Sequence, residues 1–170
     1  MTKALAWPVA AIVILILCRR ALPTLIDRLR SLRYGKFEAA FEKETVRVAE
    51  NISTEPNRSL AATSEHTDEQ LIALANVSPR AAIIEAWSRI EARLRDLAPD
   101  TDSRRRPVSE IVRRLREEQK INDVTEDSLR GLMQLRNLAV HAPERELSVQ
   151  KAVDFITLAG AILWVLQRPR

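Results

Sequence analysis

The sequence has little glycine, few aromatic residues and a single cysteine. It contains three glycines, and aromatic residues make up 4% of it. Both values are unfavourable for a β-rich fold, because turns use glycine and strands are enriched in aromatic residues. The one cysteine, Cys18, excludes an intrachain disulfide and a cysteine-based zinc site. With 46% hydrophobic and 29% charged residues, and runs of Ala, Leu, Arg and Glu, the chain is predicted to be helical with a packed core.

The basic charge is concentrated near the N-terminus. The whole chain carries 27 basic and 23 acidic residues, for a net charge of +4. Residues 1–36 contain seven basic residues and one acid, Asp27, and therefore carry +6, whereas residues 37–170 carry −2. The high pI therefore comes from residues 1–36, and the charge of residues 37–170 predicts no general affinity of the folded part for nucleic acid.

Residues 4–18, ALAWPVAAIVILILC, contain no charged side chain. As a helix they would span about 22 Å, which is shorter than the hydrocarbon core of ~30 Å, but flanking Lys3 and Arg19 can reach the interface. A signal peptide is the main alternative, yet no small-residue cleavage site follows the run, and Leu17 before Cys18 does not fit a lipoprotein signal. We therefore expect an uncleaved transmembrane anchor.

The charges that flank this anchor predict its orientation. Lys3 stands alone on one side, whereas six basic residues follow on the other: Arg19, Arg20, Arg28, Arg30, Arg33 and Lys36. Because positive charge is retained on the cytoplasmic side, we expect a single-pass protein of the bacterial inner membrane with its C-terminal domain in the cytoplasm.

Beyond the anchor we expect three regions. Residues 1–33 would form the anchor and a basic juxtamembrane helix, and residues 34–66 a stalk helix and a polar linker. Phe37, Phe41 and Val48 recur at near-helical spacing, which fits a polar stalk or a coiled pairing, and residues 51–66 have the composition of a linker. Residues 67–168 would form the folded domain.

The folded domain is predicted to be an all-α, up-and-down helical bundle of about five helices. Their starts are marked by Thr67 with Gln70, by Ser78-Pro79, by Pro107, by Asp123 with Glu126, and by Ser148. Ile83, Trp87, Ile90, Leu94 and Leu97 follow the spacing of a buried helix seam. The last helix contains FITLAGAILWVL, whose twelve residues suit a buried core helix better than a membrane span.

Arg136, Asn137 and His141 lie near the end of the fourth predicted helix, which should stop close to His141 because Pro143 disfavours helical geometry at the preceding residue. Asn137 and His141, four residues apart, share a face. An arginine beside a titratable histidine suits a phosphate site. From the residues alone a structural role is the simpler interpretation, with Arg136 paired to a carboxylate, Asn137 capping a loop and His141 covering the helix end.

Arg136-Asn137-x-x-x-His141 matches the R-x4-6-H motif of HEPN domains, including the polar residue after the arginine. The segments SPRAAIIEAWSRIEARLRDLA, SEIVRRLREEQKI and SLRGLMQLRNLAVH also look like bacterial HEPN-like families, and the resemblance covers roughly residues 70–166.

The resemblance implies a homodimer with facing motifs and, in many members, a metal-independent endoribonuclease without a cofactor. Arg136 would then hold the scissile phosphate, His141 would move a proton, and Asn137 would orient the histidine or a phosphate oxygen. Some HEPN domains instead bind protein partners without catalysis. A non-catalytic interaction or scaffold module, in stress response or phage defence, is therefore the alternative function.

The domain contains one basic stretch, whose candidate RNA- or lipid-contact residues are Arg104, Arg105, Arg106, Arg113 and Arg114. Neighbouring acidic residues dilute its charge, so a solvated helix face is the simpler interpretation, and contact with RNA or with the anionic membrane surface is the alternative. Trp87 is expected in the core, and Glu85 and Glu91 are expected to form salt bridges, although either carboxylate could orient Arg136 across the bundle. No metal site is expected, and the sequence contains no glycine-rich phosphate loop.

Overall fold

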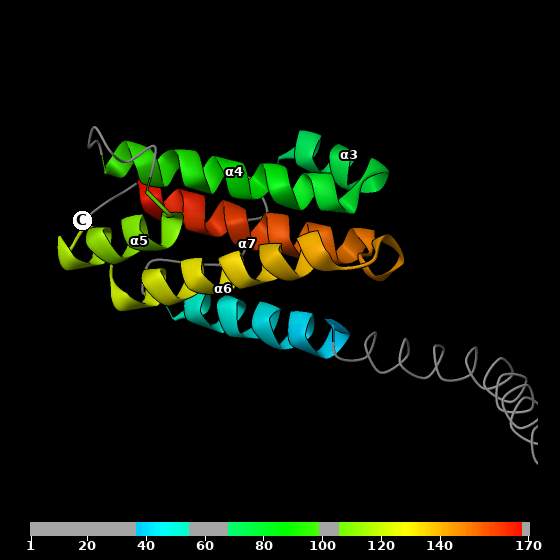
Figure 1. Cartoon of the computed structure of the whole chain (residues 1–170), viewed down its shortest axis with the longest axis horizontal. Helices are drawn as coiled ribbons and strands as arrows, with labels where there is room; N and C mark the ends of the chain where they lie inside the picture. The colour runs from blue at the N-terminus through cyan, green and yellow to red at the C-terminus, as the bar shows by residue number, and fades with distance from the viewer. Residues whose placement is uncertain (1–36, 55–67, 99–105, 168–170) are drawn as a thin grey trace, which may run out of the picture. The chain divides into compact units, whose positions relative to one another are not determined.

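The computed structural model describes residues 37–54, 68–98 and 106–167 (Figure 1). The chain divides into two units, Met1–Glu38 and Ala39–Arg170, and apart from Phe37 and Glu38 every residue described below belongs to the second. The predicted anchor at residues 4–18 lies outside the described residues, as do Arg104 and Arg105.

Every regular element in the described part of the chain is helical. Residues 37–53 form one helix. It is followed by α3 (Glu69–Val77), α4 (Pro79–Leu97), α5 (Val108–Glu117), α6 (Asp123–His141), the short 3-10 helix η1 (Glu144–Glu146) and α7 (Val149–Gln167). The all-α prediction is confirmed, and the predicted helix positions agree with the observed ones to within a few residues.

The core is built around α4 and α7, which form the most extensive helix–helix contact. Figure 1 shows α7 running alongside both α4 and α6. On α4, the seam side chains Ile83, Trp87, Ile90 and Leu94 are buried as predicted, whereas Leu97 at the helix end is only half-buried. Phe155 of α7 is fully buried. Burial of apolar area along this seam is the main favourable term that holds the helices together.

Two of the predicted helix starts differ from the structure by one residue. The side chain of Asp68, not Thr67, caps α3 and accepts hydrogen bonds from the backbone N–H groups of Gln70, at 2.9 Å, and Leu71. On α6 the cap is Asn122, whose amide oxygen accepts from the N–H of Thr125 at 2.8 Å. A cap residue needs extended backbone, which Asp68 and Asn122 have.

The predicted caps Ser78 and Ser148 are confirmed. The Ser78 hydroxyl accepts from the N–H of Ala81 at 3.4 Å, and Pro79 stands at the first helical position of α4. The Ser148 hydroxyl accepts from the N–H of Lys151 at 3.3 Å. These starts were predictable because the residues that cap a helix lie beside it in the sequence.

The helix of residues 37–53 packs against α6. Its side chains Phe41, Val48 and Ile52 are buried. Gly131 of α6 faces it so closely that a Cβ atom there would lie 2.3 Å from Val48 Cγ2 and 2.8 Å from Glu44 Oε1. The segment expected to be a polar stalk or a paired helix is therefore helical and covers α6, and its helix extends to Ser53, into the region expected to be a linker.

Among the described residues, α7 is the one helix long and apolar enough to cross a membrane. Its side chains Ala152, Phe155, Ala159 and Ile162 are nevertheless buried, and the helix contacts α3, α4 and α6. This packing is what we expected of a core helix.

Candidate site at the C-terminal end of α6

The motif residues Arg136, Asn137 and His141 occupy the last two turns of α6, which ends at His141. Ala142 has extended backbone with φ −68° and ψ 146°, as expected for a residue that precedes a proline. The predicted end of the helix is thus confirmed. The imidazole of His141 is the last side chain of the helix and is exposed.

The Arg136 guanidinium is held by its neighbour in the sequence. Its Nη1 donates a hydrogen bond to the Asn137 amide oxygen at 2.9 Å. Its Nε is buried and makes no hydrogen bond. Asn137 itself is exposed. In the structure, then, the asparagine orients the arginine, and the expected pairing of Arg136 with a carboxylate is not among the salt bridges of the described residues.

Arg80, which the sequence analysis did not single out, lies at the same helix end. It is the second residue of α4. Its Nε donates to the carbonyl oxygen of Ala139 at 3.3 Å, and its Nη2 donates to that of Ala142. These two residues flank His141 in the sequence. No local signal marks Arg80, because the carbonyl groups that it binds are 59 and 62 residues away.

This contact changes the electrostatics of the helix end. The last carbonyl groups of a helix have no partner within the helix and carry the negative end of its dipole. The Arg80 guanidinium neutralises part of that charge. Arg80, Arg136 and His141 thus supply basic groups to one end of α6, while the exposed Glu144 and the buried Glu146 follow in η1. Arg145, between these two glutamates, is also exposed, so an anion would meet a mixed surface whose basic groups lie on α4, α6 and η1.

The basic residues of α5 are paired with carboxylates. Arg113 Nη1 lies 2.7 Å from Glu117 Oε1, and Arg114 Nε lies 2.7 Å from Glu118 Oε1. Lys120 lies 2.9 Å from Glu118. The hydrogen bonds from Lys120 and Arg114 lower the pKa of Glu118. Arg106 lies at the start of this segment and is partly exposed. The structure therefore shows a largely ion-paired face along α5.

Arg116 joins α5 to the start of α6. Its guanidinium bonds to the Asp123 carboxylate, and this hydrogen bond lowers the pKa of Asp123 and raises that of Arg116. The predicted capping residue Asp123 thus lies in the first turn of α6 as an ion-pair partner.

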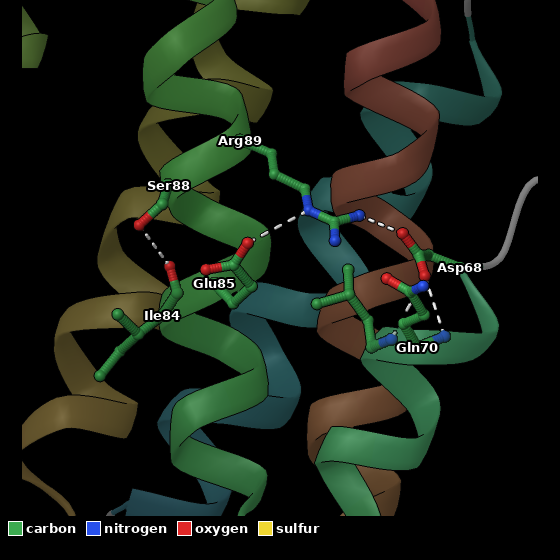
Figure 2. Close-up of polar contacts among 7 residues, drawn as sticks. Asp68, Gln70, Ile84, Glu85, Ser88 and Arg89 are labelled. Carbon is green, nitrogen blue, oxygen red and sulfur yellow. Dashed lines mark hydrogen bonds and ion pairs between the residues drawn. The ribbon is translucent and has the colours of Figure 1, made fainter.

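Glu85 and Glu91 form the salt bridges expected of them, with residues other than Arg136. Glu85 pairs with Arg89 at 3.4 Å, and Glu91 pairs with Arg95 at 3.3 Å. Figure 2 shows Arg89 reaching from α4 to Asp68 at the start of α3, with Glu85 also bonded to its guanidinium. The hydrogen bond from Arg89 lowers the pKa of Asp68.

Trp87 is buried in the core, as expected, and its indole N–H donates to Glu91 Oε1 at 2.6 Å.

Within residues 37–54, 68–98 and 106–167, no three His, Cys, Asp or Glu side chains are grouped so that they could hold a metal ion. No family model, curated protein or solved structure matches this chain.

Proposed function

We propose that this chain is a HEPN-like protein of the inner membrane that cleaves RNA without a metal ion and acts as a dimer. The observation that carries the proposal is the placement of Arg136, Asn137 and His141 on the final two turns of α6. There the imidazole is exposed, and the guanidinium is oriented by the Asn137 amide. A fixed cation and a proton carrier at one helix end are the groups that phosphodiester cleavage by an internal nucleophile requires.

The chemistry assigns one role to Arg136 and two roles to His141. Arg136 holds a non-bridging oxygen of the scissile phosphate. His141 accepts the proton of the 2′-hydroxyl while its oxygen attacks phosphorus, and the P–O5′ bond breaks. A protonated His141 donates a proton to the departing 5′-oxygen. In a dimer, this proton donor is the His141 of the second copy. The products are a 2′,3′-cyclic phosphate and a 5′-hydroxyl, and the step consumes no water.

Residues 4–18 would anchor the protein, with the helical bundle in the cytoplasm. The support for this part is the uncharged run and the excess of basic residues that follows it. Anchoring would restrict the nuclease to RNA near the membrane.

A non-catalytic interaction module is the second candidate function. The ion pairs along α5 favour it, because Arg113 and Arg114 already have carboxylate partners and offer less charge to a polyanion. In this case the bundle would gather protein partners at the membrane.

The test uses full-length protein, purified in detergent, and total RNA in excess EDTA. We expect wild type to cleave the RNA, and Arg136→Ala and His141→Ala to be inactive while their circular dichroism and thermal unfolding stay unchanged. Asn137→Ala should retain partial activity, since it removes only the group that orients Arg136. RNA that remains intact with wild type would favour the interaction module, and equal cleavage by all variants would indicate a contaminating nuclease.

A further inference from the structure

We infer that Arg80 is a positioning residue for the site at the end of α6, an inference that rests on the proposed function. Its guanidinium bonds to the carbonyl groups of Ala139 and Ala142, which bracket His141 in the chain. The backbone on either side of the imidazole is thereby tied to the first turn of α4. Pro79 and the Ser78 cap fix that turn in place.

A side chain at the end of a helix needs such support. The final turn lacks part of the hydrogen-bond ladder and frays readily. Each bond from a charged donor such as Arg80 is stronger than a neutral one. Because proton transfer requires His141 within hydrogen-bond distance of a reacting oxygen, a displacement of about 1 Å can cost on the order of 100-fold in rate.

Arg80 also reduces the electrostatic repulsion between the C-terminal end of α6 and a phosphate group. Without it, the free carbonyl groups of Ala139 and Ala142 would face an incoming anion with the negative end of the dipole. The guanidinium covers both oxygens and adds a positive charge. We therefore expect Arg80 to affect the rate of the chemical step through His141 and to affect RNA binding through its charge.

Arg93 provides a matched control on the same helix. Its Nε and Nη2 donate to the carbonyl oxygen of Leu166, at 3.1 and 2.9 Å. It thus makes the same kind of contact, at the end of α7. Arg80→Gln and Arg93→Gln each remove two bonds from a guanidinium to the backbone, but only Arg80 lies beside the motif.

The experiment measures kcat and KM of the full-length variants on an RNA oligonucleotide, together with their thermal unfolding. We expect Arg80→Gln to lower kcat at least about tenfold and to raise KM, and Arg93→Gln to leave both within about twofold at a similar loss of Tm. Arg80→Lys, which keeps the charge but loses the fork, should restore KM more than kcat. If Arg80→Gln does not fold, this lysine variant carries the test, and an unchanged kcat in it would refute the inference.

A second readout needs no catalysis. The chain has two histidines, His66 and His141, so His66→Gln leaves one imidazole signal in a carbon-13 spectrum of the full-length protein. We expect Arg80→Gln to shift or broaden that signal and Arg93→Gln to leave it in place. If wild type does not cleave RNA but Arg80→Gln still shifts the His141 signal, the proposed nuclease activity is refuted and the contact by which Arg80 positions His141 is retained. If wild type cleaves RNA but Arg80→Gln and Arg93→Gln change the His141 signal equally, the positioning role of Arg80 is refuted and the proposed nuclease activity is not.

Discussion

Gly131 of α6 lies directly against Val48 of the helix formed by residues 37–53. A Cβ atom at position 131 would lie 2.3 Å from Val48 Cγ2, closer than real Cβ contacts occur. The absence of a side chain at Gly131 is therefore what allows the two helices to approach, and this contact joins the helix of residues 37–53 to α6, which carries Arg136 and His141.

Gly131→Ala should separate these helices. The overpacking costs about 1–3 kcal/mol, partly offset by the roughly 1 kcal/mol that alanine gains over glycine in a helix. We expect lower stability in chemical denaturation, with faster amide exchange in residues 37–53. Gln134→Ala, at an exposed position of the same helix, is the control and should not destabilise the protein. Unchanged exchange in the glycine variant would contradict the packing.

The same contact predicts which fragment of the protein is the more stable. A fragment that begins at residue 67 would expose the face of α6 around Gly131, whereas a fragment that begins at residue 37 keeps Phe41, Val48 and Ile52 buried. We expect the longer fragment to be monodisperse and the shorter one to aggregate or unfold at a lower temperature, as measured by light scattering during a thermal ramp. Equal behaviour would show that this helix adds no stability.

Asp68 both caps α3 and pairs with Arg89, and the two contributions are separable. Asp68→Asn retains a good cap and loses the ion pair, so we expect a loss of about 0.2–1 kcal/mol. Asp68→Ala loses both and should cost about 1 kcal/mol more. Denaturant titrations at neutral pH measure the difference. A double-mutant cycle with Arg89→Gln isolates the pair, and a coupling energy near zero would show that the pair is not stabilising.

The pH dependence of this contribution follows from the lowered pKa of Asp68, whose ordinary value is 3.8. Because the folded protein binds the proton less readily than the unfolded chain, the ion pair stabilises at pH above 3.8 and its contribution is lost as pH falls through the folded pKa. The stability difference between wild type and Asp68→Asn should thus be constant from pH 5 to 8 and shrink below about pH 4. A difference that grows on acidification would contradict the assignment.

The paired basic face of α5 should contribute little to RNA binding. Replacing Arg113 and Arg114 by Gln leaves Glu117 without this partner and leaves Glu118 paired with Lys120. All four side chains are about a third or more exposed, so salt already screens their charges. We expect the dependence of RNA affinity on salt concentration to keep its slope. A slope reduced by about one per arginine would instead identify α5 as a phosphate-contact surface.

Membrane attachment should depend on the N-terminal run. Deleting residues 1–18 should move the protein from the membrane to the soluble fraction, because α7 buries its apolar side chains within the bundle. Cell fractionation followed by carbonate extraction measures this. Retention in the membrane after the deletion would assign the attachment to α7 or to the basic residues that follow the run.

Features encoded by neighbouring residues were predictable from the sequence. Ser78-Pro79 begins α4, Pro143 ends α6, and the spacing from Ile83 to Leu94 marks a buried seam; the structure agrees on each. The same local logic placed Arg136, Asn137 and His141 on one helix end. What it could not supply was the orientation of the Arg136 side chain, which depends on a choice among rotamers.

Contacts between distant segments were not predictable. Arg80, Arg93 and Lys120 each donate to a backbone carbonyl group in the final turn of a helix that is distant in the sequence, at separations of up to 73 residues. An arginine on a helix surface has no local pattern that identifies such a partner. The packing of residues 37–53 against α6 was not predicted for a related reason. It depends on Gly131, which has no side chain and lies far along the chain from these residues.

The most direct test of the proposed reaction is product analysis in EDTA with two RNA oligonucleotides of the same sequence. One strand is all-ribose, and the other carries a single 2′-deoxy sugar at the preferred cleavage position. Full-length wild type should cut the all-ribose strand to fragments that end in a 2′,3′-cyclic phosphate and begin with a 5′-hydroxyl. It should not cut at the deoxy position, and His141→Ala should not cut either strand. Cleavage at the deoxy position, or fragments that begin with a 5′-phosphate, would contradict attack by the 2′-hydroxyl with His141 as the proton carrier.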